Sequence, residues 1–81
     1  MRVRVLAFAR LRELLQAPET WFDLPHDAGV DDLWLELERR FPLLHGEAKW
    51  VRVACNGRLV DGVQPLREGD EIALLPPVGG G

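Results

Sequence analysis

The chain has 81 residues, of which 47% are apolar and 28% charged, and its formal net charge is −3. This length fits one small domain, and this composition is too apolar for a disordered segment. An acidic balance without a basic run argues against a surface for nucleic acid or an anionic membrane, since both need clustered Lys and Arg. We therefore expect one folded domain whose partners are proteins or small molecules.

Two strands and a short helical segment are predicted before Pro25. Residues 2–8 (RVRVLAF) alternate charged and apolar side chains, with β-branched Val3 and Val5 between the charges, which is typical of a half-buried strand. The next segment, ARLRELLQ, has leucines at helical spacing and predicts about two turns of helix that end before Ala17-Pro18. TWFDL then predicts a second short strand.

The main helix is predicted to begin at residue 30, and Pro42 ends it. Its apolar side chains recur at intervals of three and four residues and form one stripe, made of Val30, Leu33, Leu37 and Phe41. Two aspartates in the first turn and two arginines in the last turn are placed favourably against the helix dipole. A single stripe predicts that this helix covers one face of a core.

A hairpin and a last strand follow the helix. Asn56-Gly57 stands between VRVAC and RLV, and this dipeptide is a strong hairpin signal because both turn positions need a positive φ. EIALL, residues 71–75, predicts a final strand that ends where Pro76 and Pro77 forbid further ladder bonds. This order predicts an α+β roll, with a mixed sheet of about five strands and one main helix on one face.

The sequence has no feature typical of a secreted or membrane protein. Its single cysteine, Cys55, excludes an internal disulfide framework and suits a reducing compartment. The opening residues alternate charge and apolarity instead of forming the apolar core of a signal peptide, and no apolar run reaches transmembrane length. We therefore expect a cytoplasmic protein.

Residues suited to catalysis or metal binding are scarce. His26 and His45 lie in different predicted loops without Cys, Asp or Glu at ligand spacing, so we interpret them as exposed and expect no metal site. Cys55 is in phase with Val51 and Val53 and has no neighbouring His or Lys, which favours a packing thiol over a nucleophile. We expect no catalytic residue in this chain and expect that it is not an enzyme.

The last six residues, PPVGGG, are the segment that packing does not explain. We expect residues 1–75 to form the domain and residues 76–81 to be a flexible tail. Gly79, Gly80 and Gly81 carry no side chain that would obstruct a channel, and the chain ends in a carboxylate on an unhindered carbon. Such a terminus suits a narrow pocket of another protein, although a terminus without any function fits the composition as well.

Four segments resemble one known family: FARLREL, VDDLWLEL, NGRLV and PLREGDEIALLPPVGGG. Over its whole length the chain resembles the small subunit of molybdopterin synthase, the MoaD group of ubiquitin-like sulfur carriers. The most specific part of the resemblance is GDEIALLPPVGGG, which precedes and includes the terminal glycines. The resemblance implies a β-grasp (ubiquitin-like) fold and a carrier role in molybdenum cofactor biosynthesis, with no cofactor bound by the carrier.

The resemblance also implies partners and a reaction sequence. An E1-like enzyme uses ATP to adenylate the terminal glycine carboxylate, a sulfur donor protein converts it to a thiocarboxylate, and the large synthase subunit receives the tail. Gly81 is then the residue that carries sulfur to a pterin precursor. A carrier for the thiazole of thiamine, a ubiquitin-like protein modifier and a purely structural interaction module remain as alternatives.

Strand parity predicts a docking surface. The alternating pattern turns Phe8 away from the core, and a two-residue turn pairs Ala54 with Leu59 and turns Leu59 outward. Leu75 points to the other face of its strand from the apolar residues expected to be buried there. In the β-grasp arrangement the strands that carry these three residues are neighbours. Phe8, Leu59 and Leu75 are therefore expected to form an apolar patch beside the tail, with Arg12 at its rim. Cover of these side chains by the chain's own loops, and a solvated charge at Arg12, are the alternatives.

Overall fold

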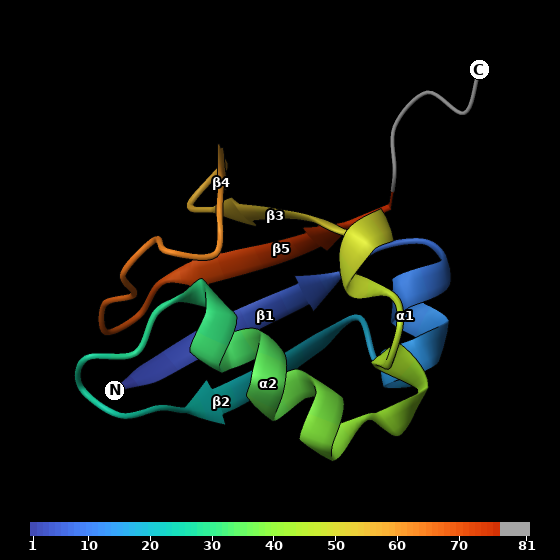
Figure 1. The fold of residues 1–81 in the computed structure, drawn as a ribbon, viewed down its shortest axis with the longest axis horizontal. Coiled ribbons are helices and arrows are strands. Elements are labelled where there is room, and N and C mark those ends of the chain that lie inside the picture. Colours follow the sequence, from blue (N-terminus) through green and yellow to red (C-terminus); the bar gives the residue numbers. More distant parts are fainter. Residues whose placement is uncertain (77–81) are drawn as a thin grey trace.

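The computed structural model describes residues 1–76. Within this range the chain forms a five-stranded sheet, one main helix and a short helix at the end of the sheet (Figure 1). The α+β roll predicted from the sequence, a mixed sheet with one main helix, is confirmed. The elements in chain order are β1 (Arg2–Ala7), α1 (Arg10–Leu15), β2 (Glu19–Asp23), α2 (Val30–Arg40), the 3₁₀ turns η1 (Pro42–Leu44) and η2 (Ala48–Trp50), β3 (Arg52–Cys55), β4 (Arg58–Val60) and β5 (Glu71–Leu75).

The strand order of the sheet is β2-β1-β5-β3-β4. The first and last strands, β1 and β5, pair in parallel at its centre, and the other neighbouring strands are antiparallel. Parallel strands end at the same edge of a sheet, so β5 ends beside the end of β1. The short helix α1 lies at this edge and buries Leu11 and Leu15 there (Figure 1). The chain therefore leaves the sheet next to α1.

The core lies between α2 and the face of the sheet that α2 covers (Figure 1). Alternate residues of β1 and three of the four stripe residues predicted for the main helix are buried. The fourth, Phe41, follows the end of α2 and is half-buried. Leu44 and Leu66 complete the core from segments for which the sequence predicted no element. The buried side chains of the two elements are Val3, Val5 and Ala7 of β1 and Val30, Leu33 and Leu37 of α2.

The first turn of α2 is held by the segment that follows β4. The Val30 N–H donates to the Gln64 carbonyl and the Asp31 N–H to the Gly62 carbonyl, each at 3.0 Å. These bonds satisfy N–H groups that have no partner inside the helix. They also fix the far end of β4 to α2, so the hairpin is anchored at both of its ends.

The hairpin of β3 and β4 turns through Asn56 and Gly57, as predicted. Their φ angles of 51° and 84° lie in the left-handed region that this turn needs. The Asn56 side chain also ties the turn to the start of β5: its Oδ1 accepts from the Glu71 N–H at 2.9 Å, and its Nδ2 donates to Asp70 at 2.9 Å. The turn and this anchor fix the register of the hairpin.

Candidate functional site

The structure describes only part of the predicted site. Gly79, Gly80 and Gly81, and the tail beyond Pro76, lie outside the described residues. The surfaces around Pro76 are therefore the part of the site that can be built from atoms. The other four predicted site residues, all of which are described, are Phe8, Arg12, Leu59 and Leu75.

A row of apolar side chains crosses the outer face of the sheet, which is the face that α2 does not cover. The strand registers place its members opposite one another in the order Leu6, Ala73, Ala54 and Leu59. Residues paired across neighbouring strands point to the same face, so the row runs through β1, β5, β3 and β4. Leu75 follows Ala73 by two residues and shares this face.

Phe8 and Leu59 are the exposed members of this surface. Phe8 follows β1 directly and is 38% exposed, Leu59 is 54% exposed, and Leu75 is half-buried. The outward orientation predicted by parity is confirmed for Phe8 and Leu59, and the described loops of the chain do not cover them. A role in binding stays a prediction for all of them. We call the following residues the outer patch: Leu6, Phe8, Ala54, Leu59, Ala73 and Leu75.

Charged side chains border the outer patch at the end away from Pro76. Arg4 Nη2 donates to Glu71 Oε2 at 2.5 Å. Trp21 of β2 lies opposite Arg4, and the Arg2 guanidinium lies over the Trp21 ring at 4.6 Å from its centroid. The outer face is thus charged near the start of β1. Near Pro76 it is apolar apart from the exposed Arg52, which pairs with Leu75 across β3 and β5.

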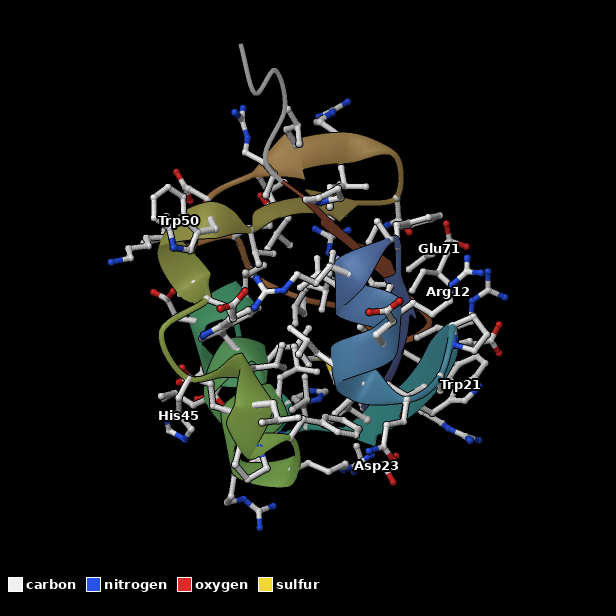
Figure 2. All side chains as sticks on the ribbon, turned by 90° about the vertical axis from the view of Figure 1, so that its right-hand side faces the viewer. Arg12, Trp21, Asp23, His45, Trp50 and Glu71 are labelled. Carbon is white, nitrogen blue, oxygen red and sulfur yellow. The ribbon has the colours of Figure 1, made fainter. Side chains whose placement is uncertain are left out.

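Arg12 is exposed on α1. Figure 2 shows its side chain on the same side of the molecule as Trp21 and Glu71, with Trp50 on the opposite side. Trp21 and Glu71 belong to the charged border of the outer face. The position of Arg12 at the rim of the patch, and its part in binding, stay predictions.

Cys55 is buried, as its phase in the strand predicted. Its Sγ donates to Asp70 Oδ2 at 3.6 Å, and the same carboxylate accepts from the Arg67 N–H at 2.8 Å. Burial, and secondly the negative charge of Asp70, raise the pKa of the Cys55 thiol. A thiol with a raised pKa is protonated at neutral pH, so Cys55 is a packing side chain and a poor nucleophile.

Replacing Cys55 by Ala is expected to leave sulfur transfer unchanged and to lower the free energy of unfolding by about 1 kcal/mol. The loss reflects the small cavity left by the sulfur atom. Urea unfolding measures the stability, and conversion of the terminal carboxylate, followed by intact mass, measures the transfer. A folded variant that has lost all transfer would mean that the thiol handles sulfur.

The remaining polar candidates do not gather into a second site. His26 and His45 are both exposed, in different loops. Within residues 1–76 the structure has no group of three or more His, Cys, Asp or Glu side chains placed to hold a metal ion. No helix in that range is long and apolar enough to cross a bilayer.

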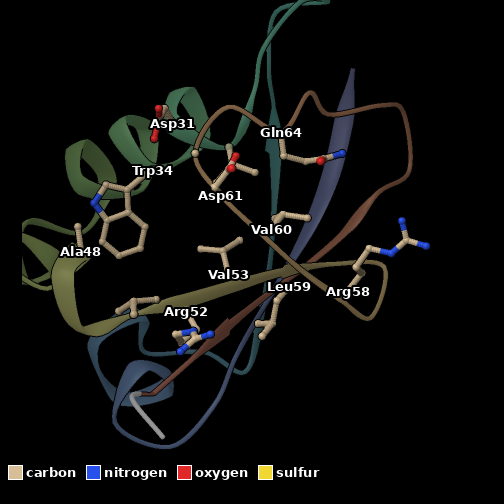
Figure 3. A pocket seen from close by; sticks show the side chains of 13 residues that line it. Asp31, Trp34, Ala48, Arg52, Val53, Arg58, Leu59, Val60, Asp61 and Gln64 are labelled. Atoms are coloured by element: carbon tan, nitrogen blue, oxygen red, sulfur yellow. The ribbon is translucent and has the colours of Figure 1, made fainter.

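The largest hollow, about 590 Å³, lies between the start of α2 and the β3–β4 hairpin (Figure 3). Val53 and Val60, which pair across β3 and β4, line it together with the ring of Trp34. Asp31 and Asp61 lie on one side of this hollow and the arginines of β3 and β4 lie on the other (Figure 3). Its described lining contains no His, Cys or Ser, and its opposite charges are separated, so it offers no nucleophile with a neighbouring base.

Trp50 is an exposed residue beside Pro76 that the sequence did not single out. It ends η2, just before β3, and it is 54% exposed. Because β3 runs antiparallel to β5, the start of β3 lies beside the end of β5. Trp50 and Pro76 accordingly line one hollow of about 300 Å³. The sequence alone could have indicated this position only if the tryptophan were considered together with the antiparallel pairing of β3 and β5, two strands that are distant in sequence.

A comparison with known families decides the relationship. The sequence profile of the ThiS family matches residues 5–81. The chain belongs to the ThiS family. This ThiS-family chain is 34% identical over 83 residues to the molybdopterin synthase sulfur carrier subunit of Chlamydomonas reinhardtii, with all of both chains covered. It is 36% identical over 84 residues to the subunit of the same name from Drosophila ananassae, covering 100% of this chain and 92% of the relative.

Solved structures of ThiS-family relatives share the fold. The putative molybdopterin converting factor subunit 1 of Pyrococcus furiosus matches with a TM-score of 0.90 at 34% identity, covering 96% of this chain and 99% of that chain. SAMP1 of Haloferax volcanii matches with a TM-score of 0.89 at 28% identity, with both chains fully covered. A chain from the complex of subunits 1 and 2 of the Helicobacter pylori molybdopterin-converting factor matches with a TM-score of 0.72 at 29% identity over both full lengths.

The fold extends to more distant proteins. A ubiquitin-like protein of Caldiarchaeum subterraneum has a TM-score of 0.60 at 12% identity, covering 99% of this chain and all of that chain. At this identity the similarity concerns the fold alone. Together with the sheet order, it confirms the β-grasp fold that the sequence resemblance implied for this ThiS-family chain.

Proposed function

We propose that this chain is the sulfur carrier subunit of a molybdopterin synthase and that Gly81 carries the sulfur. The observation that supports this most directly is the full-length similarity to curated sulfur carrier subunits, which includes the terminal glycines. The geometry agrees with this proposal, because β5 ends beside the partly exposed apolar outer patch and the chain leaves the sheet there at Pro76. A carrier needs these two parts, a terminus that reaches a partner and a surface on which that partner docks.

The chemistry of the carrier resides at its terminus. A carboxylate is a poor electrophile, so an E1-like enzyme first joins the Gly81 carboxylate to the AMP part of ATP, and pyrophosphate leaves. The acyl-adenylate has a good leaving group, and the outer sulfur of a persulfide on the sulfur donor protein displaces AMP and forms an acyl disulfide. A second thiol then reduces the S–S bond, which leaves the thiocarboxylate on Gly81 and the donor cysteine in a disulfide with that thiol. The thiocarboxylate then gives its sulfur to a pterin precursor in the large subunit. The carrier itself binds no cofactor during these reaction steps, and ATP is a substrate of the activating enzyme.

The folded domain supplies affinity and no catalytic group. The only cysteine of the chain is buried and has a raised pKa, so it does not take part in sulfur transfer. Ordering a glycine tail costs about 1 to 2 kcal/mol per residue, so the tail by itself contributes little binding energy. We assign the binding energy to the outer patch, whose most exposed member is Leu59. A single unpaired Cys55 also fits a reducing compartment, the cytoplasm.

The proposal is tested by incubating the chain with ATP, an E1-like enzyme and a sulfur donor protein. Intact mass spectrometry is expected to show one terminal oxygen replaced by sulfur, and this sulfur should be lost again when the large subunit and a pterin precursor are added. An unchanged mass, in a mixture that converts a known carrier, would contradict the proposal.

A protein modifier is the second candidate, because SAMP1 of H. volcanii, a small archaeal modifier protein, matches the fold over its full length. The same activated carboxyl group would then form an isopeptide bond with a lysine of a target protein. Fragment mass spectra that contain Gly81 linked to a lysine ε-amine would favour this reading. A third destination, the thiazole of thiamine, would appear as transfer of sulfur to a thiazole-forming enzyme and none to the pterin precursor.

A further inference from the structure

The point where the chain leaves the sheet has apolar surface on two sides. The outer patch lies on one side. The other side is the hollow of about 300 Å³ beside η2, which we call the inner rim; its lining residues are Arg10, Leu11, Glu47, Trp50, Val51 and Pro76. We propose that the inner rim is a second contact surface for the large subunit and receives an apolar side chain from the lip of the cleft that takes the tail. This inference rests on the proposed function.

Hydrogen bonds hold the walls of the inner rim in place. The Trp50 N–H donates to the Glu47 carbonyl at 2.8 Å, which fixes the start of η2. Arg10 of α1 holds the same residue from the other side, with Nη1 donating to Glu47 Oε1 at 2.6 Å and Nη2 to Oε2 at 3.5 Å. Glu47 therefore joins the two walls of the hollow. Trp50, which is 54% exposed, stands at the edge of this structure and adds a large apolar surface beside Pro76.

The length of the tail requires the partner to come close to this rim. Five residues follow Pro76, and they span at most about 17 Å when fully extended. The reacting pocket must lie within that distance of Pro76, so the mouth of the cleft stands directly against the domain. A cleft that encloses a chain has walls on both sides of it. One wall then meets the outer patch and the other meets Trp50.

The composition of the inner rim selects the kind of group it receives. Leu11, Trp50 and Val51 give it apolar walls. The one cation of its lining, Arg10, is already paired with Glu47, and the nearby Lys49 Nζ lies over the Trp50 ring at 5.4 Å from its centroid. An apolar side chain of a protein fits these walls, and tryptophan is among the residues that most often dominate binding energy at interfaces.

The test compares Trp50→Ala with Leu35→Ala, both in the full-length chain. Leu35 is 63% exposed but lies on α2, away from the outer patch and from Pro76, so it is the control. Calorimetric titration with the large subunit is expected to show a Kd raised about 10-fold or more for Trp50→Ala and by less than about twofold for Leu35→Ala. Circular dichroism confirms that both variants are folded.

A second measurement does not depend on a variant that folds. In the ¹⁵N-labelled wild-type chain, the indole N–H signal of Trp50 is expected to shift when the large subunit binds, while the backbone N–H signal of Leu35 on α2 stays in place. Wild-type affinity in Trp50→Ala, or an unmoved Trp50 signal in a complex that forms, overturns the inference and leaves the proposed function intact. A wild-type chain that neither takes up sulfur nor binds the large subunit overturns the proposed function, and the inference with it.

Discussion

A chain that lacks Gly81 is expected to fold as the intact chain does and to accept no sulfur. The described core ends at Leu74, so removing the last residue takes away no packing. It does shorten the reach of the carboxylate by about 3.5 Å, which separates the reacting atoms in a site where about 1 Å of misplacement already costs much of the rate. Intact mass after incubation with ATP, the E1-like enzyme and the sulfur donor should show the unmodified chain only.

Two further variants make this result specific to the terminus. A chain extended by one leucine after Gly81 keeps all of its glycines but carries a side chain at its end, and it too should accept no sulfur. Val78→Ala changes the same segment and leaves the terminal glycines in place, so it should be converted as the wild type is. Normal conversion of the shortened chain would mean that the position of the carboxylate is not what the activating enzyme reads.

Replacing Leu59 by Glu is expected to weaken binding to the large subunit and to the E1-like enzyme by at least about 2 kcal/mol, or roughly 30-fold in Kd. The substitution places an unpaired charge on the most exposed residue of the outer patch, where a partner would strip it of water. The fold should persist, because Leu59 is largely exposed and its strand pairing with Ala54 uses only backbone groups. One surface beside one tail serves both partners, so both affinities should fall.

Leu35→Glu is the matched control for this substitution. Leu35 is also an exposed leucine, but it lies on α2, which packs against the opposite face of the sheet. Calorimetric titration should give it wild-type affinities, and circular dichroism should give both variants the wild-type spectrum. If Leu59→Glu unfolds the domain, its outward orientation is misassigned, and if it binds both partners as tightly as the wild type, the outer patch is not the docking surface.

Local patterns in the sequence predicted the individual elements and the faces of their residues well. The alternation in β1 gave the correct buried side chains, and Asn56-Gly57 gave the hairpin with Ala54 opposite Leu59. These features depend on neighbours within a few residues, where the period of side chains and the φ preference of the turn decide the outcome.

Other features depend on which distant segments become neighbours. The alternation of side chains along a strand does not determine which strands pair. Parity assigns Ala73 to a face but does not say that it pairs with Leu6 on one side and Ala54 on the other, so the continuous row of the outer patch was not predicted. The turns η1 and η2 are too short to show a helical period, and the burial of Leu44 and the position of Trp50 were missed for that reason.

The parallel pairing of β1 with β5 joins residues that are up to 67 positions apart, as between Arg4 and Glu71. Synthesis proceeds from the N-terminus, so the strand that stands third of five in the sheet is made last. A chain interrupted before β5 lacks the middle of its sheet, two of the six residues of its outer patch, and its terminal glycines at once. If the chain is the carrier proposed above, an incomplete copy is therefore expected not to occupy the partners unproductively, because the same final segment completes the docking surface and the reactive end.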